Sequence, residues 1–433
     1  MMNLPVDFEK YTRQLMGEQL YTELLNGLSD DVPVSIRVNP FKCPEHFSIP
    51  LKDECVPWCQ YGYYLKHRPN FTFDPLFHAG LYYVQEASSM FHEYVIQQLI
   101  HKIGNDDLRV LDLCAAPGGK SIAIRSILPD NCLLYSNEPI RARAQVLMEN
   151  MLKWGHPNVV VTNNYARDYQ RANMRFDIIV ADVPCSGEGM FRKDQNAIQE
   201  WSWHNVEKCW KLQREIISDI WPCLKPGGFL VYSTCTFNEK ENEENVNWIA
   251  EELGADFITI NIQDEWNITG SLVDHHPVYR FIPGKTRGEG LFVAVLRKHS
   301  HQEETKNTPP RMATLKVMTY EPTIANGKKK DIPNHAQALS IRFNKEDYPN
   351  VDIDYRQAIC YLRKEAIVLP AETPRGIVLL TYHHIPIGFA KNIGNRANNL
   401  YPMEWRIKST HIPEHETILE LAQPHIDGGH NED

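Results

Sequence analysis

The chain has 433 residues, of which 42% are hydrophobic and 23% charged, a composition typical of a globular protein with two or three domains. Its 45 Lys and Arg residues against 55 Asp and Glu residues give a net charge of −10, which argues against a protein that coats nucleic acid by bulk charge. No apolar stretch is long enough for a membrane span and the N-terminus lacks a signal pattern, so we expect a cytoplasmic protein without membrane contact.

The first 90 residues predict a small α+β module. Apolar residues recur at helical spacing over residues 8–28, and a strand follows at Val34–Val38, which Pro40 ends. Aromatic residues and prolines fill the next stretch, and a further helix is expected over residues 87–100. We therefore take residues 1–90 as an N-terminal module.

Between residues 91 and 298, short apolar runs alternate with helical segments. The runs read as strands are Arg109–Leu113, Leu133–Asn137, Val159–Thr162, Phe176–Ala181, Phe229–Ser233 and Phe292–Leu296. This alternation predicts an α/β fold with a doubly wound, Rossmann-like sheet and helices on both faces. Ligands of such a sheet bind at the carboxyl ends of its strands.

The composition shifts again after the last of these runs. Residues 299–313 are polar and lack a strand pattern, so we expect a linker there. Residues 314–433 are long enough for a small C-terminal α+β domain, with strands at Gly376–Tyr382 and Ile385–Phe389. We expect a helix and then a strand within residues 351–369, and a frayed tail over residues 427–433.

A glycine-rich loop follows the first strand of the core, at Asp112-Leu-Cys-Ala-Ala-Pro-Gly-Gly-Lys120-Ser. Its Gly-Lys-Ser ending is that of a phosphate-binding P-loop, but that loop requires a glycine where this chain has Cys114. The loop also lacks the G-x-G-x-x-G pattern of a dinucleotide-binding site. An acidic strand end and a neutral loop better suit a cofactor that carries an ammonium group, such as S-adenosylmethionine. Glu138, at the end of the next strand, can accept the ribose hydroxyls of such a cofactor.

Two further strands each deliver a cysteine at their carboxyl ends. One reads Asp182-Val-Pro-Cys185-Ser-Gly-Glu-Gly-Met-Phe-Arg-Lys193, and the other Ser233-Thr-Cys235-Thr. A single cysteine at a strand end is usually an inert buried thiol, but two beside one cofactor loop favour catalysis. Cys55 and Cys59 form the only close pair of cysteines in the sequence, and no second Cys or His pair at zinc spacing follows, so no metal is predicted.

Together these motifs resemble the Nol/Nop/Sun family of RNA 5-methylcytosine methyltransferases, and within it the bacterial RsmF (YebU-like) group that modifies small-subunit ribosomal RNA. Ser35-Ile-Arg-Val-Asn-Pro40 and Gly80-Leu-Tyr-Tyr-Val-Gln85-Glu-Ala-Ser-Ser-Met90 are also similar to this family, so the resemblance covers about residues 1–300. Segments 387–391 and 399–402 resemble, less specifically, the PUA-like tail of the group.

The resemblance implies a function and a set of residue roles. The function is S-adenosylmethionine-dependent methylation of cytosine carbon 5, most simply in small-subunit rRNA or the 30S subunit. Apart from the resemblance, we expect a monomer without a metal. The implied catalytic residues are Cys235 as nucleophile, Cys185, Asp182 and Lys120. The implied cofactor residues are Cys114, Ala115, Ala116, Pro117, Gly118, Gly119, Lys120, Glu138, Asn164 and Asp182.

RNA contacts are expected from the N-terminal module, from the PUA-like tail, and from Arg192 and Lys193 in the active-site motif. Phe191, Trp201 and Trp203 could stack on bases or belong to the core. The adenine contact is open, because the family usually has Asp where this chain has Asn164, with Asn163 and Tyr165 as neighbours.

Three other functions fit parts of the pattern. A tRNA cytosine methyltransferase would use the same motifs. A DNA cytosine methyltransferase is suggested by Glu244-Asn245-Val246, although the Gly-Gly-Lys-Ser loop is foreign to that class. A non-catalytic ribosome-assembly factor would keep the fold without activity, but both cysteines, Asp182 and the glycine-rich loop are intact.

Overall fold

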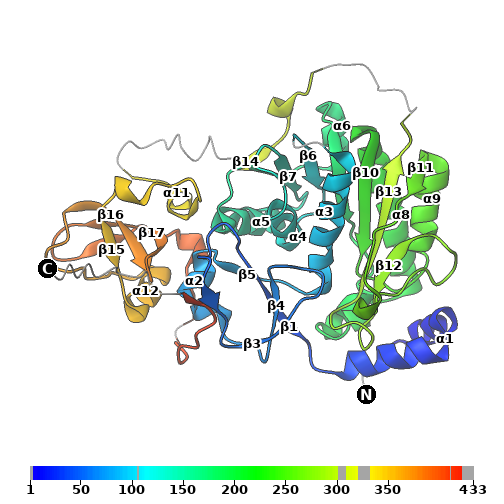
Figure 1. Cartoon of the computed structure of the whole chain (residues 1–433), viewed down its shortest axis with the longest axis horizontal. Helices are drawn as coiled ribbons and strands as arrows, with labels where there is room; N and C mark the ends of the chain where they lie inside the picture. Colours follow the sequence, from blue (N-terminus) through cyan, green and yellow to red (C-terminus); the bar gives the residue numbers. More distant parts are fainter. Residues whose placement is uncertain (1–2, 105–106, 301–308, 320–331, 410, 422–433) are drawn as a thin grey trace, which may run out of the picture.

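The computed structural model describes residues 3–104, 107–300, 309–319, 332–409 and 411–421 (Figure 1). Its centre is a nine-stranded sheet in the order β11-β13-β10-β9-β6-β7-β8-β14, with β12 paired to β13. The strands are β6 (Arg109–Asp112), β7 (Leu133–Asn137), β8 (Val159–Thr162), β9 (Phe176–Asp182), β10 (Leu224–Thr234), β11 (Ala255–Phe257), β12 (Val278–Phe281), β13 (Leu291–Lys298) and β14 (Val317–Thr319). Strands β6 to β10 pair in parallel and the others antiparallel.

Helices cover both faces of this sheet, because its central strands are apolar on both sides. One face packs against α3 (Phe91–Ile103), α4 (Gly119–Arg125) and α5 (Arg141–Trp154). The other packs against α6 (Ala166–Arg171), α8 (Trp203–Ile220) and α9 (Glu243–Leu253). The strand order reverses between β6 and β9, which is where a doubly wound sheet opens a ligand crevice.

The N-terminal segment forms a helix and a small antiparallel sheet. Helix α1 (Val6–Ser29) is interrupted at Gly17, whose φ of 73° lies in the left-handed region. The sheet has the order β3-β4-β1-β5, and α2 (Pro75–His78) follows β4 in the chain. Its strands are β1 (Val34–Val38), β3 (Lys52–Cys55), β4 (Gly62–Leu65) and β5 (Tyr82–Val84).

The C-terminal domain is built on a sheet in the order β15-β16-β17-β18. Its strands are β15 (Asn350–Asp352), β16 (Gly376–Tyr382), β17 (Ile385–Asn392) and β18 (Ala397–Asn399), and its helices are α11 (His335–Leu339) and α12 (Tyr355–Leu362). The chain then returns to the N-terminal module, where β19 (Glu420–Leu421) pairs with β2 (Phe47–Ser48). Apolar residues of the N-terminal sheet and of this domain form one continuous cluster.

The structure confirms the predicted fold class, with a Rossmann-like core flanked by two smaller α+β parts. Two elements differ from the expectation. Within residues 351–369 the sequence predicts a helix and then a strand, but strand β15 precedes helix α12. After the helix, Ile367 forms an isolated bridge with Ala397. Residues 317–319, which the expected limits place in the C-terminal domain, form strand β14, which pairs with β8 and extends the core sheet.

Helix α1, expected in a separate N-terminal module, packs against the core domain. Its buried residues Phe8, Tyr21 and Leu24 contact the core through Phe191, Trp201 and other apolar side chains. The domain limits at 90, 298 and 313 stay a prediction, and the tail at 427–433 and most of the linker lie outside the described residues. No described helix has both the length and the apolar character needed to cross a membrane.

Candidate active site

The two cysteines singled out in the sequence meet at the carboxyl edge of the central sheet. Cys185 follows β9 and Cys235 follows β10, and these strands pair in parallel. Their sulfur atoms lie 3.0 Å apart, and the backbone amide of Cys235 points to Cys185 Sγ at 3.5 Å. Both side chains are partly exposed, so they can reach a substrate.

Asp182 ends β9 and is held by two neighbours. Lys120 Nζ lies 2.7 Å from Oδ2, and the hydroxyl of Ser233 donates to Oδ1 at 2.8 Å. Burial alone would raise the pKa of Asp182, but the charge of Lys120 and these hydrogen bonds lower it below its ordinary value of 3.8. The carboxylate is therefore ionised at neutral pH and fixed through both oxygens.

The two thiols are not equivalent. The hydrogen bond with Cys235 and then burial raise the pKa of Cys185 well above its ordinary value of 9.0. Cys185 therefore keeps its proton at neutral pH and can donate it to Cys235 Sγ.

The glycine-rich loop, residues 114–120, is anchored by three side chains outside it, one that follows β5 and two on α5. Its carbonyls accept hydrogen bonds from Gln85 to Gly119 at 3.0 Å, from Arg143 to Ala116 at 3.1 Å and from Asn150 to Pro117 at 2.8 Å. Gly118 has a φ of 121°, and a Cβ there would lie 3.3 Å from Leu147 Cδ1. A larger residue at this turn would strain the loop.

Asn137, which sequence reasoning missed, joins this loop to the end of β8. Its carbonyl accepts from Ala115 N at 2.8 Å, and its side-chain amide donates to Leu113 O and Asn164 O. Its side-chain oxygen accepts from Asn164 N at 3.0 Å. The position directly before Glu138 gave no signal in the sequence, because an amide at a strand end usually faces solvent.

Two carboxylates beside the loop have oxygen atoms that fit a polar cofactor. Asp112 Oδ1 and Glu138 Oε2 are buried and have no hydrogen-bond partner among the described residues. Their other oxygens accept from Ser121 Oγ at 2.7 Å and from Ile140 N at 2.9 Å. Glu138 Oε2 lies 3.4 Å from Arg143 Nη1, in an ion pair without a hydrogen bond. Buried acceptors that lack a hydrogen bond are costly, so these two atoms suit the hydroxyl and ammonium donors of S-adenosylmethionine.

The adenine contact expected from Asn164 meets a competing interaction. Its amide oxygen accepts from the backbone of Lys316 at 3.0 Å, and its amide nitrogen lies 3.3 Å from Lys316 O. Asn163 is also engaged, by Lys316 Nζ at 2.6 Å and by the carbonyls of Glu138 and Pro139. Tyr165 is 62% exposed and stays available. The segment before β14 thus occupies both amides, which no sequence pattern indicated.

A contact between Arg192 and RNA requires that this side chain lie on the surface, but Arg192 is buried. Its side chain is 5% exposed and pairs with Glu289 at 3.0 Å. It also donates to the carbonyls of Gly27 and Gly288. Because these acceptors occupy the guanidinium, Arg192 fastens the active-site segment to α1 and to the loop before β13. Lys193, 30% exposed, is the accessible member of the pair.

The aromatic residues near the site belong mainly to the core. Phe191 and Trp201 are buried against Phe8 of α1, with ring centroids 5.0 and 5.5 Å from it. Trp203 packs on Tyr11. The core alternative left open by the sequence is therefore the one that the structure supports for these rings.

A buried carboxyl, Glu241, supports the loop that carries Cys185. It accepts from the amide and the hydroxyl of Ser186, from Gln213 and from Asn238. Burial, then the charge of Glu188, raises its pKa from 4.5 to about 7. Sequence reasoning also missed this residue, because it lies in an acidic run that is typical of an exposed helix start.

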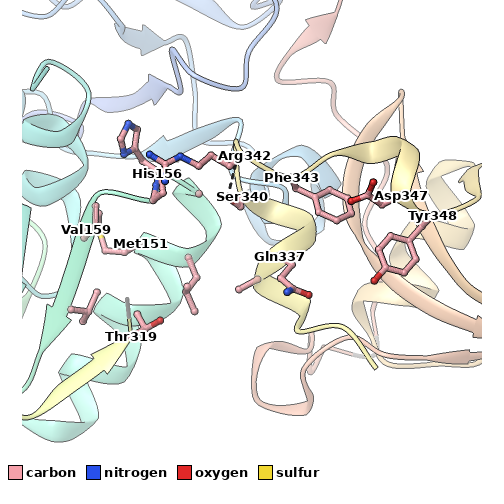
Figure 2. Close-up of a pocket in the computed structure, with 15 residues that line it drawn as sticks. Met151, His156, Val159, Thr319, Gln337, Ser340, Arg342, Phe343, Asp347 and Tyr348 are labelled. Atoms are coloured by element: carbon pink, nitrogen blue, oxygen red, sulfur yellow. Dashed lines mark hydrogen bonds between the residues drawn. The ribbon is translucent and has the colours of Figure 1, made fainter. Parts of the chain in front are cut away.

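A cavity of about 260 Å³ lies away from these residues, between the core and the C-terminal domain. Figure 2 shows Met151, His156 and Val159 on the core side and Gln337, Phe343 and Tyr348 on the other. Val159 begins β8, so the cavity extends to the end of the sheet opposite to Cys185 and Cys235. It is separate from the candidate active site.

Solved structures with the same fold support this description of the core. PH0851 shares 22% identity at a TM-score of 0.58, over 68% of this chain and 66% of that chain. A methyltransferase homolog protein from Pyrococcus horikoshii shares 25% identity at a TM-score of 0.55, over 67% of this chain and 93% of that one.

Curated relatives extend the similarity over nearly the whole chain. Ribosomal RNA small subunit methyltransferase F of Cronobacter sakazakii is 29% identical over 81% of this chain and 84% of its own length. The protein of the same name from Photobacterium profundum is 28% identical over 93% of this chain and 97% of its own length.

Family models match the three parts in order. They are the N-terminal domain of 16S rRNA methyltransferase RsmF at residues 4–87, 16S rRNA methyltransferase RsmB/F at residues 99–297, and the methyltransferase RsmF PUA domain at residues 348–407. All three parts of one architecture are present in sequence order, and the chain belongs to the RsmF family of methyltransferases.

Proposed function

We propose that this protein methylates carbon 5 of cytosine in small-subunit ribosomal RNA, with S-adenosylmethionine as its cofactor. Membership of the RsmF family supports the substrate class. The observation that carries the chemistry is the pair of partly exposed cysteines, 3.0 Å apart, beside an ionised Asp182 and a glycine-rich loop.

Cys235 acts as the nucleophile. Carbon 5 of cytosine is a poor nucleophile, and addition of a thiolate to carbon 6 converts the ring to an enamine with a reactive carbon 5. Cys185 keeps its proton and faces Cys235 Sγ, which supports this order of roles. The bound cofactor supplies an electrophilic methyl group on a sulfonium sulfur.

Asp182 holds the base by hydrogen bonds at the edge where cytosine and uracil differ. Lys120 and Ser233 fix its two oxygens, so the carboxylate is oriented before the base arrives. It favours cytosine, because the exocyclic amino group of cytosine is a donor that uracil lacks. Cys185 assists loss of the carbon 5 proton, after which the bond from Cys235 to carbon 6 breaks.

Residues 114–120 would hold the cofactor, Glu138 would bind its ribose and Asp112 would bind its ammonium group. The two buried carboxylate oxygens that lack a hydrogen bond support this assignment. Asn164 would bind the adenine amino group through its amide oxygen, which would then exchange its contact with the backbone of Lys316. The N-terminal module, the PUA-like domain and Lys193 contact RNA, and the protein acts as a monomer on rRNA or on the 30S subunit.

Bisulfite mapping of total RNA tests the proposal. RNA from cells with the protein, without it, and with only the Cys235→Ala variant is compared. We expect small-subunit rRNA sites to lose methylation in both the deletion and the variant. Loss at tRNA sites instead would redirect the substrate to tRNA, and unchanged methylation everywhere would contradict the catalytic proposal.

A further inference from the structure

A buried histidine lies directly behind the carboxylate proposed to hold the cytosine. His92 is the second residue of α3 and has no exposed surface. Its Nε2 lies 3.0 Å from Ser233 Oγ, and Ser233 in turn lies 2.8 Å from Asp182 Oδ1. Its other ring nitrogen, Nδ1, lies 3.2 Å from the carbonyl oxygen of Ser89. The imidazole therefore ends a chain of polar groups that leads to Asp182.

The ring of His92 carries one proton at neutral pH. Burial, then the positive charge of Lys120, lowers its pKa to about 3, although Asp182 and the Ser89 carbonyl act in the opposite direction. A neutral imidazole has one N–H group. The nitrogen that carries it decides which group donates in each hydrogen bond between His92, Ser233 and Asp182.

The two tautomers have opposite effects on Ser233. With the proton on Nε2, His92 donates to Ser233 Oγ and the Ser233 hydroxyl is left to donate to Asp182, whereas Nδ1 then faces the Ser89 carbonyl without a hydrogen bond. With the proton on Nδ1, His92 donates to Ser89, and Nε2 draws the Ser233 hydroxyl away from Asp182. A hydrogen bond to a carboxylate is charge-assisted and stronger than one between neutral groups. The contact with Ser89 is also the longest of the three.

We propose that His92, as its Nε2–H tautomer, is a positioning residue that orients Asp182 through Ser233. This inference rests on the proposed function, in which Asp182 binds the cytosine. Lys120 holds one oxygen of the carboxylate and the chain from His92 holds the other, so the carboxylate cannot rotate. Through these hydrogen bonds a residue of α3, which lies outside the catalytic motifs, orients the carboxylate that binds the substrate.

Two substitutions separate this role from simple packing. His92→Phe keeps a planar ring but removes the donor, and His92→Gln places an amide N–H near the position of Nε2. We expect His92→Phe to lower kcat about ten-fold, with the KM for RNA and the affinity for S-adenosylmethionine changed less than about two-fold. His92→Gln should recover kcat to within about three-fold of the wild type.

A double-variant cycle checks the route through Ser233. His92→Phe should have little further effect on kcat once Ser233→Ala has removed the intermediate hydroxyl, because the two residues act in series. Equal losses in both backgrounds would contradict the proposal. A His92→Phe enzyme with full kcat, or a His92→Gln enzyme as slow as His92→Phe, would also overturn it.

Nitrogen NMR of the wild-type protein with labelled histidine reads the tautomer without any turnover. We expect a neutral His92 with its proton on Nε2. A proton on Nδ1 would contradict the inference, even if neither variant folds. The two proposals fail differently, since a wild-type protein that methylates no cytosine contradicts the proposed function and leaves the NMR result intact.

Discussion

Gln85 donates its side-chain amide to the carbonyl oxygen of Gly119 at 3.0 Å, and so joins the N-terminal module to the glycine-rich loop of the core. Gln85 is itself held by Arg37, whose guanidinium donates to Gln85 Oε1 at 2.8 Å. Arg37 is fully buried and also pairs with Glu93. The loop is therefore positioned by a chain of contacts that begins in β1.

Gln85→Ala should weaken cofactor binding. Removal of one hydrogen bond to the loop costs about 1 kcal/mol, which corresponds to about a five-fold rise in the Kd for S-adenosylmethionine. Isothermal titration calorimetry measures this change. Gln98→Ala, which removes an amide on α3 that bonds to Asn261 far from the loop, is the control. Equal affinities for wild type and Gln85→Ala would contradict this anchoring role.

Cys185→Ser should trap an RNA adduct. If Cys185 assists release of the product, its loss leaves Cys235 bonded to carbon 6 of the base. We expect a species of reduced mobility on denaturing gels, formed with RNA and cofactor. Cys185→Ser combined with Cys235→Ala should form none. Normal turnover by the single variant without a shifted band would show that the roles of the two cysteines are assigned wrongly.

Arg192 and Lys193 should respond differently to substitution by alanine. Arg192→Ala leaves the Glu289 carboxylate buried without its main partner, which costs about 3 kcal/mol of folding stability. Thermal unfolding should show a lower Tm for Arg192→Ala and an unchanged Tm for Lys193→Ala.

Lys193→Ala should instead weaken RNA binding and lower the slope of log Kd against log salt by about one. Binding assays at several salt concentrations measure this, with cofactor affinity as the control. Identical slopes for wild type and Lys193→Ala would remove Lys193 from the RNA interface.

Glu241 should make folding stability fall as the pH rises. Its pKa is about 7 in the folded chain against an ordinary value of 4.5 for glutamate, so the folded state binds more protons between these limits. The contribution is fully present below about pH 4.5 and is lost as the pH rises through about 7, by an amount on the order of 3 kcal/mol.

Urea unfolding of the wild type and Glu241→Gln at about pH 5, 6 and 7 tests this. The variant should lose less stability over the range, whereas Glu251→Gln, at an exposed position of α9, should follow the wild type. Burial raises the pKa of Asp112 in the same direction, to about 7, so part of the dependence should persist in Glu241→Gln. A wild-type stability that rises over this range would contradict the prediction.

The sequence predicted the parallel strands of the core well, because each is a short apolar run between turn or helix signals. Strands β7 and β8 have the predicted limits, as does β16 in the C-terminal domain. The two motif cysteines and Asp182 also come together as their place at strand ends suggested, and Lys120 reaches Asp182 from the glycine-rich loop.

What the sequence could not predict are contacts between residues far apart in the chain. Arg192 looked like an accessible cation because its partner, Glu289, lies 97 positions later. The Asn164 amide looked free because Lys316 reaches it from beyond the predicted linker. His92 lies on a helix with an apolar face, where its neighbour Ser233 leaves no local pattern. Periodicity reports burial and says nothing of such pairings.

The apolar cluster shared by the N-terminal sheet and the C-terminal domain can be completed only late in synthesis. Ile36 and Tyr82 leave the ribosome early, but Ile359 and Leu380, which belong to the same cluster, are made almost 300 residues later. Until then, one side of the N-terminal sheet has no permanent cover. A nascent chain, or one truncated after the core, would expose this surface to aggregation and to chaperones. The C-terminal domain thus completes the apolar packing of the N-terminal sheet.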